Sequence, residues 1–225
     1  MLLPEQFIPL AEQSGQIVSI GQWVIEAACA QLGRWAADPQ SSHLKLAVNI
    51  STRQFRQPGF VEHLTRTLHL HGADPRHLRL ELREALIRDN PQQTLLSMTA
   101  LNDIGVRFAL EDFGMDFSSL SHLKRLPLDQ IKIAQTLLCS LNSDAHDVAV
   151  VKTIIGIGRD LGLAVIAAGV ETVQQRDMLR ELGCTLCQGY LFGQPAPLAE
   201  FEGLLGSASH AGPVSACGSG GGRRR

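Results

Sequence analysis

Hydrophobic and polar residues along this chain follow two spacings, one typical of helices and one typical of strands. Between residues 20 and 35 the apolar side chains recur every three or four positions, which predicts an amphipathic helix. Its two tryptophans, Trp23 and Trp35, are expected in the core, the usual place for aromatic residues at helical spacing. Between residues 44 and 49 the apolar residues fall on every second position, which predicts a strand.

Helical and strand patterns alternate through the rest of the chain. Strands are predicted at residues 44–49, 78–82, 106–110, 130–133, 164–168 and 186–188, and helices at 4–12, 20–35, 59–70, 90–105, 148–162, from 172 on, and 198–205. This order is typical of right-handed βαβ crossovers and a parallel sheet, so an α/β fold is expected. The predicted domain covers residues 1–206. Residues 207–225 are rich in Gly, Ser and Arg and are predicted to form a disordered tail.

Composition narrows the class of protein. With 225 residues, 44% of them hydrophobic, the chain can bury a sizeable core. A formal net charge of -2 gives no basic surface for duplex nucleic acid or an anionic membrane, and no apolar run is long enough to span a bilayer. Five scattered cysteines do not make a disulfide framework, which favours a reducing compartment and a cytoplasmic location.

Polar residues gather where the predicted strands end. They are Asn49, Glu81, Glu111, Asp112, Lys132 and Gln188. Parallel α/β folds collect their chemistry at the carboxyl ends of strands, so these side chains are expected to share a site, although each alone has an ordinary explanation as a turn or surface residue. Carboxylates with an amide oxygen suit Mg²⁺, Mn²⁺ or Ca²⁺ better than zinc, and a nearby lysine would position water or offset phosphate charge.

The adjacent acids Glu111 and Asp112 need a special backbone to act together. Neighbouring side chains of a regular strand face opposite ways, so both carboxylates reach one site only where the chain starts to turn, which Gly114 permits. The alternative is an ordinary solvated loop, because acidic residues are common in turns.

Several motifs, taken in order, resemble the EAL-domain family. They are Val48-Asn49-Ile50-Ser51, Leu80-Glu81-Leu82-Arg83-Glu84, Glu111-Asp112-Phe113-Gly114, Leu126-Pro127-Leu128-Asp129-Gln130-Ile131-Lys132-Ile133, Gly169-Val170-Glu171-Thr172 and Gln188-Gly189-Tyr190. The resemblance implies a TIM-like (β/α)₈-type barrel. It also implies hydrolysis of the bacterial second messenger cyclic di-GMP to linear pGpG, with two divalent cations, Mg²⁺ or Mn²⁺.

The resemblance also implies roles for individual residues. It makes Lys132 and Glu171 catalytic and Glu84 the anchor of the loop after the acidic pair, and it places Gln188 and Arg53 at the substrate. The implied metal ligands are Asn49, Glu81, Glu111 and Asp112.

Departures from the family pattern begin at the N-terminus. The chain starts at the helix after the family's name-giving Glu-Ala-Leu motif, so the glutamate of that motif and the first two strands are missing, and about six strands are expected. The tripeptide Glu84-Ala85-Leu86 belongs to a later motif. A barrel of six strands leaves two unpaired edges, so a homo-oligomer, or an upstream or partner segment that completes the barrel, is expected.

Further departures fall at the site. Ala168 stands where the family has its proposed general base, Glu111 replaces an aspartate, Ala134 replaces another, and the loop reads Met115-Asp116-Phe117. Alanine cannot take a proton, so the predicted function is cyclic di-GMP binding with impaired or absent hydrolysis. An active phosphodiesterase and a nucleotide-independent protein-interaction domain are the alternatives.

Overall fold

The computed structural model describes residues 4–114, 123–141 and 144–208. Two compact units divide the chain, residues 1–194 and residues 195–225. The first unit contains the sheet, and the described part of the second is a helix, α11 (Leu198–Ala208). This helix extends three residues beyond its predicted end. The predicted disordered tail falls almost wholly outside the described residues, so it stays a prediction.

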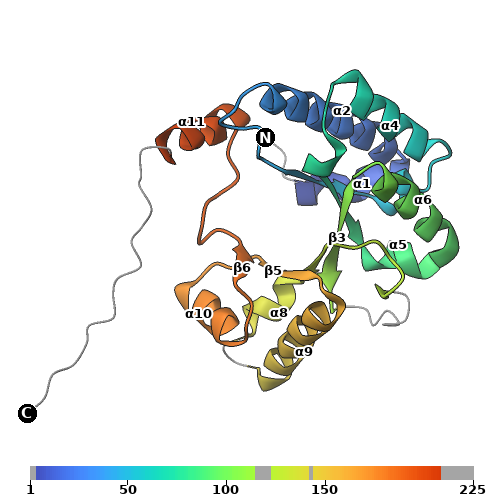
Figure 1. The fold of residues 1–225 in the computed structure, drawn as a ribbon. Coiled ribbons are helices and arrows are strands. Elements are labelled where there is room, and N and C mark those ends of the chain that lie inside the picture. The colour runs from blue at the N-terminus through green and yellow to red at the C-terminus, as the bar shows by residue number, and fades with distance from the viewer. Residues whose placement is uncertain (1–3, 115–122, 142–143, 209–225) are drawn as a thin grey trace, which may run out of the picture. The chain divides into compact units, whose positions relative to one another are not determined.

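Six parallel strands form one sheet, in which spatial order equals sequence order (Figure 1). Their bounds are β1 (Leu46–Ile50), β2 (Leu78–Arg83), β3 (Arg107–Phe113), β4 (Gln130–Ile133), β5 (Ala164–Ala168) and β6 (Leu186–Gln188). All six predicted strands are present. The strands form an open half-barrel, which confirms the expected incomplete α/β barrel of six strands.

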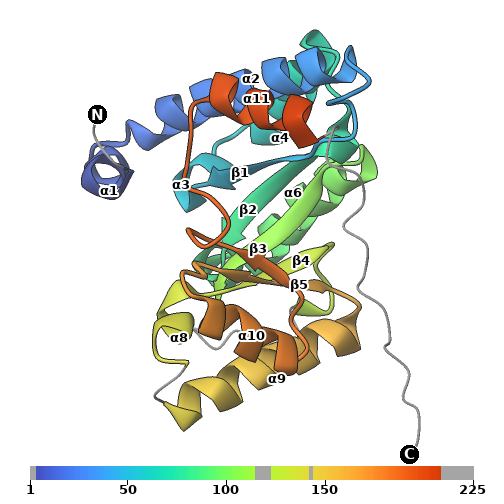
Figure 2. The same cartoon turned by 90° about the vertical axis from the view of Figure 1, so that its left-hand side faces the viewer.

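Helices connect the strands and cover the outer side of the sheet (Figure 2). They are α1 (Pro4–Ser14), α2 (Ile17–Ala36), α3 (Thr52–Phe55), α4 (Phe60–Leu70), η1 (Pro75–His77), α5 (Glu84–Asp89), α6 (Pro91–Asp103), α8 (Gln135–Cys139), α9 (Ala145–Leu161) and α10 (Val173–Glu181). Helix α2 packs on β1, α6 on β3, and α9 on β4 and β5. None of the described helices combines the length and hydropathy of a membrane span.

The alternation of side chains along each strand separates core from site. Leu80, Leu82 and Leu110 point to the helices and are fully buried. Burying each such side chain contributes about 1.5–3 kcal/mol. Since neighbouring residues face opposite ways, Glu81 between Leu80 and Leu82, and Glu111 after Leu110, point to the inner side of the half-barrel. The apolar pattern therefore fixes which face carries the chemistry.

Capping residues set several helix ends where the sequence predicts them. The side chain of Asn90 accepts a hydrogen bond from the backbone N–H of Gln93 at the start of α6. Thr172 and Gln175 form the predicted capping box of α10. Gly158 lies where α9 approaches β5 so closely that a Cβ on it would collide with Val165.

One expectation about the core is wrong. Trp35 is buried as expected, but 68% of Trp23 is exposed. The buried stripe of α2 runs through Ile25, Ala28 and Leu32. Trp23 precedes Ile25 by two residues, about 200° around the helix, so it lies on the opposite face. Apolar spacing showed that the helix is amphipathic but did not show where its buried stripe ends.

The two outer strands of the half-barrel differ. Strand β1 has five residues, with the side chains of Ala47 and Asn49 exposed, whereas β6 has three, and 47% of Leu186 is exposed. Among the described residues β1 pairs only with β2, and β6 only with β5. The sheet thus ends in two edges, as expected for an open sheet of six strands.

Candidate functional site

Four consecutive strands bring polar side chains together on the inner face of the half-barrel. The ammonium Nζ of Lys132 on β4 donates to Glu81 Oε2 on β2 at 2.7 Å and to Glu111 Oε1 on β3 at 2.9 Å. The three side chains are 8%, 11% and 19% exposed, respectively. The ammonium therefore bridges two carboxylates that are largely shielded from water.

Asn49 on β1 completes this cluster. With its amide nitrogen turned to the carboxylates, it donates to Glu111 Oε2 at 2.7 Å, to Glu111 Oε1 at 3.1 Å and to Glu81 Oε2 at 3.2 Å. With the amide reversed, its oxygen faces the carboxylate oxygens, and such a set of oxygens suits a hard cation. The structure thus brings together four of the residues predicted for the site.

Two groups of the cluster, Glu111 and Lys132, have raised pKa values. Burial raises the pKa of Glu111, and the neighbouring Glu81 adds to this, while Lys132 opposes it without reversing it. Burial lowers the pKa of Lys132, but the hydrogen bonds and charges of Glu81 and Glu111 outweigh burial, so the pKa lies above its ordinary value. Lys132 is therefore a cation at neutral pH.

The adjacent acids Glu111 and Asp112 lie in a β-bulge of β3. The register between β3 and β4 shifts between Leu110 and Phe113, so the two residues Glu111 and Asp112 lie opposite the single residue Lys132 in the strand pairing. Glu111 turns toward Lys132, while Asp112 is exposed and takes a left-handed backbone with φ 53°. The left-handed turn thus begins at Asp112, two residues before Gly114, where the sequence predicts the turn. In the described residues, no group of three or more His, Cys, Asp and Glu side chains suits a metal.

Ala168 and Gln188 lie at the far end of the sheet. They are register partners on β5 and β6, and Gln188 is exposed. Glu171 follows on the turn before α10 and accepts a hydrogen bond from Gln135 Nε2 at 3.2 Å. Sequence reasoning missed Gln135, because its only signal is its place just after β4. Ala134 is 2% exposed and contributes a buried methyl group.

Arg53 and Glu84 occupy other surroundings. Arg53 is exposed, and its Nη1 donates to the backbone oxygen of Glu12 at 2.7 Å, so it ties α3 to the end of α1. Glu84 opens α5 and is 4% exposed. The loop that Glu84 is expected to anchor, residues 115–122, lies outside the described residues.

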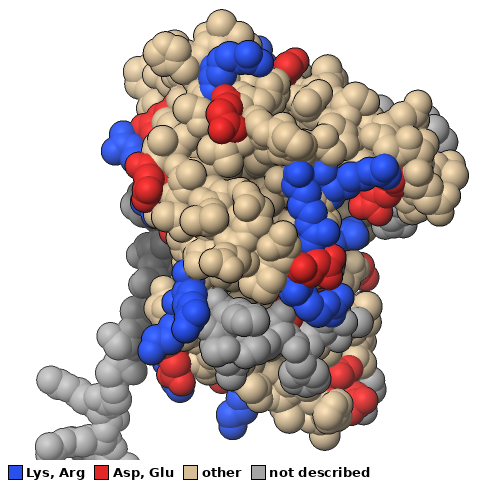
Figure 3. Space-filling model, turned by 90° about the vertical axis from the view of Figure 1, so that its right-hand side faces the viewer, with Lys and Arg blue, Asp and Glu red and all other residues tan. Residues whose placement is uncertain are grey.

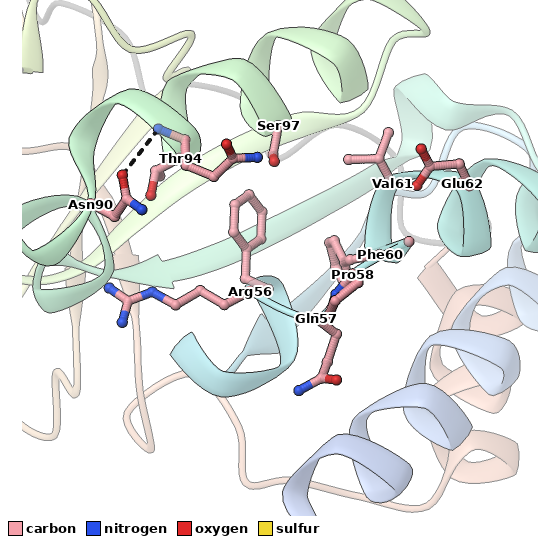
Figure 4. Close-up of a pocket in the computed structure, with 12 residues that line it drawn as sticks. Arg56, Gln57, Pro58, Phe60, Val61, Glu62, Asn90, Thr94 and Ser97 are labelled. Atoms are coloured by element: carbon pink, nitrogen blue, oxygen red, sulfur yellow. Dashed lines mark hydrogen bonds between the residues drawn. The ribbon is translucent and has the colours of Figure 1, made fainter.

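A cavity of about 360 Å³ opens on the helical side (Figure 4). Arg56, Gln57 and Pro58, between α3 and α4, line one wall, and Thr94 and Ser97 of α6 line another. The rings of Phe55 and Phe60 also line it, with their centroids 5.2 Å apart. None of the strand-end polar residues lines this cavity, so it is separate from the cluster.

Charged side chains on the outer surface are mixed in sign. On the face shown in Figure 3, Lys and Arg side chains lie among Asp and Glu side chains and many uncharged residues. Arg56 pairs with Asp89 at 3.1 Å, and Arg76 with Asp74 at 2.6 Å. Such exposed pairs contribute little to stability.

Comparison with known proteins shows the family. The model of the EAL domain matches residues 1–195. This chain belongs to the EAL-domain family. MucR of Pseudomonas aeruginosa, a bifunctional diguanylate cyclase/cyclic di-GMP phosphodiesterase, is 39% identical over 209 residues, which are 93% of this chain and 30% of MucR. NbdA of the same organism, a cyclic di-GMP phosphodiesterase, is 36% identical over 205 residues, 91% of this chain and 26% of NbdA.

Solved structures agree with this assignment. The MucR phosphodiesterase in its c-di-GMP complex superposes with a TM-score of 0.85 at 38% identity, covering 89% of this chain and 81% of that one. A manganese and cyclic di-GMP complex of BlrP1 from Klebsiella pneumoniae gives 0.73 at 27% identity, covering 86% and 48%. EAL structures have a TIM-like barrel, which the open half-barrel of six strands in this chain matches. The chain spans less than a third of the length of MucR and of NbdA.

Proposed function

We propose that this chain binds cyclic di-GMP and hydrolyses it weakly or not at all. The observation that carries the proposal is an EAL-type fold that keeps Glu81 and Lys132 in contact at the strand ends, while Ala168 stands where the resemblance puts a general base. The MucR and BlrP1 structures are cyclic di-GMP complexes. Binding tolerates the loss of one base better than hydrolysis does, because only the reaction needs the proton transfer.

Each strand-end residue has a role in this proposal. Lys132 offsets phosphate charge beside Glu81, and Gln188 contacts the nucleotide from the end of β6. Arg53 would contact the nucleotide after its hydrogen bond to the backbone oxygen of Glu12 breaks. Glu84 would anchor the loop after β3. Glu171 would orient water or phosphate from the turn before α10, held by Gln135.

The proposal includes one divalent cation, not the two that the family resemblance implies. Oxygens of Glu81 and Glu111, with that of Asn49 when its amide is reversed, would hold one hard cation, Mg²⁺ or Mn²⁺, in place of the Lys132 ammonium group. When bound, such a cation would polarise a phosphate. A second cation finds fewer ligands, because methyl groups stand at positions 134 and 168 and Asp112 is the one further carboxylate of the acidic pair. The donor set therefore does not fit a complete two-metal centre.

The missing base sets the expected size of the defect. Loss of a general base costs about 10²- to 10⁴-fold in rate. Fewer metal ligands lower the occupancy of the site and reduce the rate further. Turnover below a thousandth of that of an intact relative is therefore expected, while nucleotide affinity stays measurable.

Calorimetry and turnover together test this function. Titration of the folded chain with cyclic di-GMP and Mg²⁺ is expected to release heat without producing pGpG. Ala168→Glu is expected to raise turnover, and Ala164→Glu, at the other end of the same strand, is the matched control. No binding heat from folded protein would contradict the proposal, and wild-type turnover equal to that of an intact relative would support an active phosphodiesterase.

Two alternatives rest on specific observations. An active phosphodiesterase is favoured by the retained contacts of Lys132 with Glu81 and Glu111. A nucleotide-independent interaction domain is favoured by the open edge of β1 and the exposed Trp23 on α2, the helix that packs on β1. Turnover separates the first alternative from the proposal, and ligand binding separates the second.

The open edges also carry a proposal about partners. We expect a second copy, or an upstream or partner segment, to complete the half-barrel, because unpaired strand edges invite pairing. Light scattering after size-exclusion chromatography tests this, and a monodisperse monomer with one cooperative melting transition would contradict it. The cytoplasmic location stays a prediction from the cysteine content.

A further inference from the structure

Lys132 has a position that bears on the metal requirement of the proposed nucleotide site. We infer that its ammonium group is the resident counter-cation of Glu81 and Glu111, so that a divalent metal can bind this pair only by displacing Lys132. The inference deepens the proposed function, but its test needs no nucleotide. A failure to bind cyclic di-GMP would leave it standing.

The geometry puts one cation where another would have to bind. Lys132 Nζ lies 2.7 Å from Glu81 Oε2 and 2.9 Å from Glu111 Oε1, so it occupies the space between the two carboxylates. A metal shared by the same oxygens would sit about 2.0–2.6 Å from each, within contact distance of the ammonium. A metal and the ammonium group would repel each other strongly at that separation, so only one of them occupies the space between these two oxygens.

Burial makes the occupancy by Lys132 favourable. All three side chains are less than a fifth exposed, so water screens their charges poorly. The formal charge of the trio is -1 with Lys132 present and -2 without it. Asn49, with its nitrogen turned inward, donates to both carboxylates and satisfies further lone pairs. Lys132 therefore neutralises one of the two negative charges of the pair, and Asn49 occupies further lone pairs of both carboxylates.

The length of Glu111 contributes to this arrangement. Glu111 sits in the β-bulge opposite Lys132, and its side chain is one methylene longer than that of aspartate. An aspartate at the same backbone position would end about 1 Å short of its present contact with Lys132. The longer side chain closes the ion pair and leaves less room for a metal with its bound waters.

Thermal unfolding with and without divalent cations tests the inference. The full chain, Lys132→Met and Glu111→Asp are melted in EDTA and in about 10 mM Mg²⁺ or Mn²⁺ at matched ionic strength. Lys152→Met, which removes an exposed lysine of α9, is the control for a lost positive charge. Wild type and Lys152→Met are expected to shift by less than about 1 °C. Lys132→Met is expected to melt lower in EDTA and to rise by at least about 3 °C with metal.

The outcomes decide the inference even if one variant does not fold. A saturable rise in Tm of wild type as large as that of Lys132→Met would overturn it, as would a folded Lys132→Met that ignores metal. If Lys132→Met does not fold, Glu111→Asp decides, because it keeps every charge and is expected to respond to metal more than wild type. An equal response of Glu111→Asp and wild type would count against displacement.

Discussion

Replacing Asp112 tests how the β-bulge beside the site is held. Among the described residues, Asp112 is the only non-glycine residue with a positive φ, 53°, and its side chain is exposed. A substitution there changes the backbone cost with little loss of buried surface. The left-handed conformation costs L-residues roughly 1–2 kcal/mol, less for aspartate and most for β-branched residues.

The magnitude follows from this conformation. Asp112→Val is expected to lower the free energy of unfolding by about 1–2 kcal/mol, which is a fall of about 2–8 °C in Tm for a domain of this size. Asp112→Gly is expected to stay within about 0.5 kcal/mol of wild type, because relief of strain is offset by the greater freedom of glycine in the unfolded chain.

Urea denaturation in EDTA measures both variants without interference from metals. Ala47→Val is the matched control, since it places the same β-branched side chain at an exposed position of a regular strand, β1. Its free energy of unfolding is expected to change by less than about 0.5 kcal/mol. Equal losses in Asp112→Val and Ala47→Val would refute the backbone argument.

A helix cap, a buried thiol and an exposed indole give three further predictions. Asn90→Ala is expected to lower the free energy of unfolding by about 1 kcal/mol, because the side-chain cap of α6 is lost. Urea denaturation measures this change, and an equal loss in Gln92→Ala would contradict it. Burial raises the pKa of Cys29 to about 11, above its ordinary value near 9. Since the folded pKa is the higher one, its stability contribution is complete below pH 9 and is lost as pH rises toward 11; Cys29→Ala should flatten that decline in melts across this range. Acrylamide should quench the fluorescence of wild type much more than that of Trp23→Phe, and equal quenching would mean that Trp23 is covered in solution.

Sequence periodicity predicted the fold because the strands alternate so regularly. Leu78, Leu80 and Leu82 mark one buried face of β2 and leave Glu81 on the other, which is the information that a two-residue rhythm carries. The short helices α3, α5 and α8 escaped prediction, because helices of four to six residues contain too few turns for a helical period. The exposed Trp23 shows that apolar spacing predicts that α2 has a buried face but does not predict which apolar residues belong to that face.

The sequence predicted which side chains meet at the candidate site wherever their position at a strand end decides it. Asn49, Glu81, Glu111 and Lys132 meet because parallel strands in sequence order bring their carboxyl ends together. The separate orientation of Asp112 depends on a bulge, for which a local sequence contains no unique signal. The link between Arg53 and Glu12 joins residues 41 positions apart and depends on tertiary packing, so no local sequence pattern predicts it.

The unequal strands at the two ends of the sheet have a consequence for how far association proceeds. Strand β1 offers five residues without proline or charge, whereas β6 offers three and is followed at once by Gly189. Neither strand contains proline or a charged residue, so the longer strand, β1, is the better template for an added strand. If two copies join through β1, the same edge is used on both, and the contact closes on itself about a two-fold axis. Growth through β1 then stops at a pair, so association through this edge is expected to give discrete dimers rather than filaments.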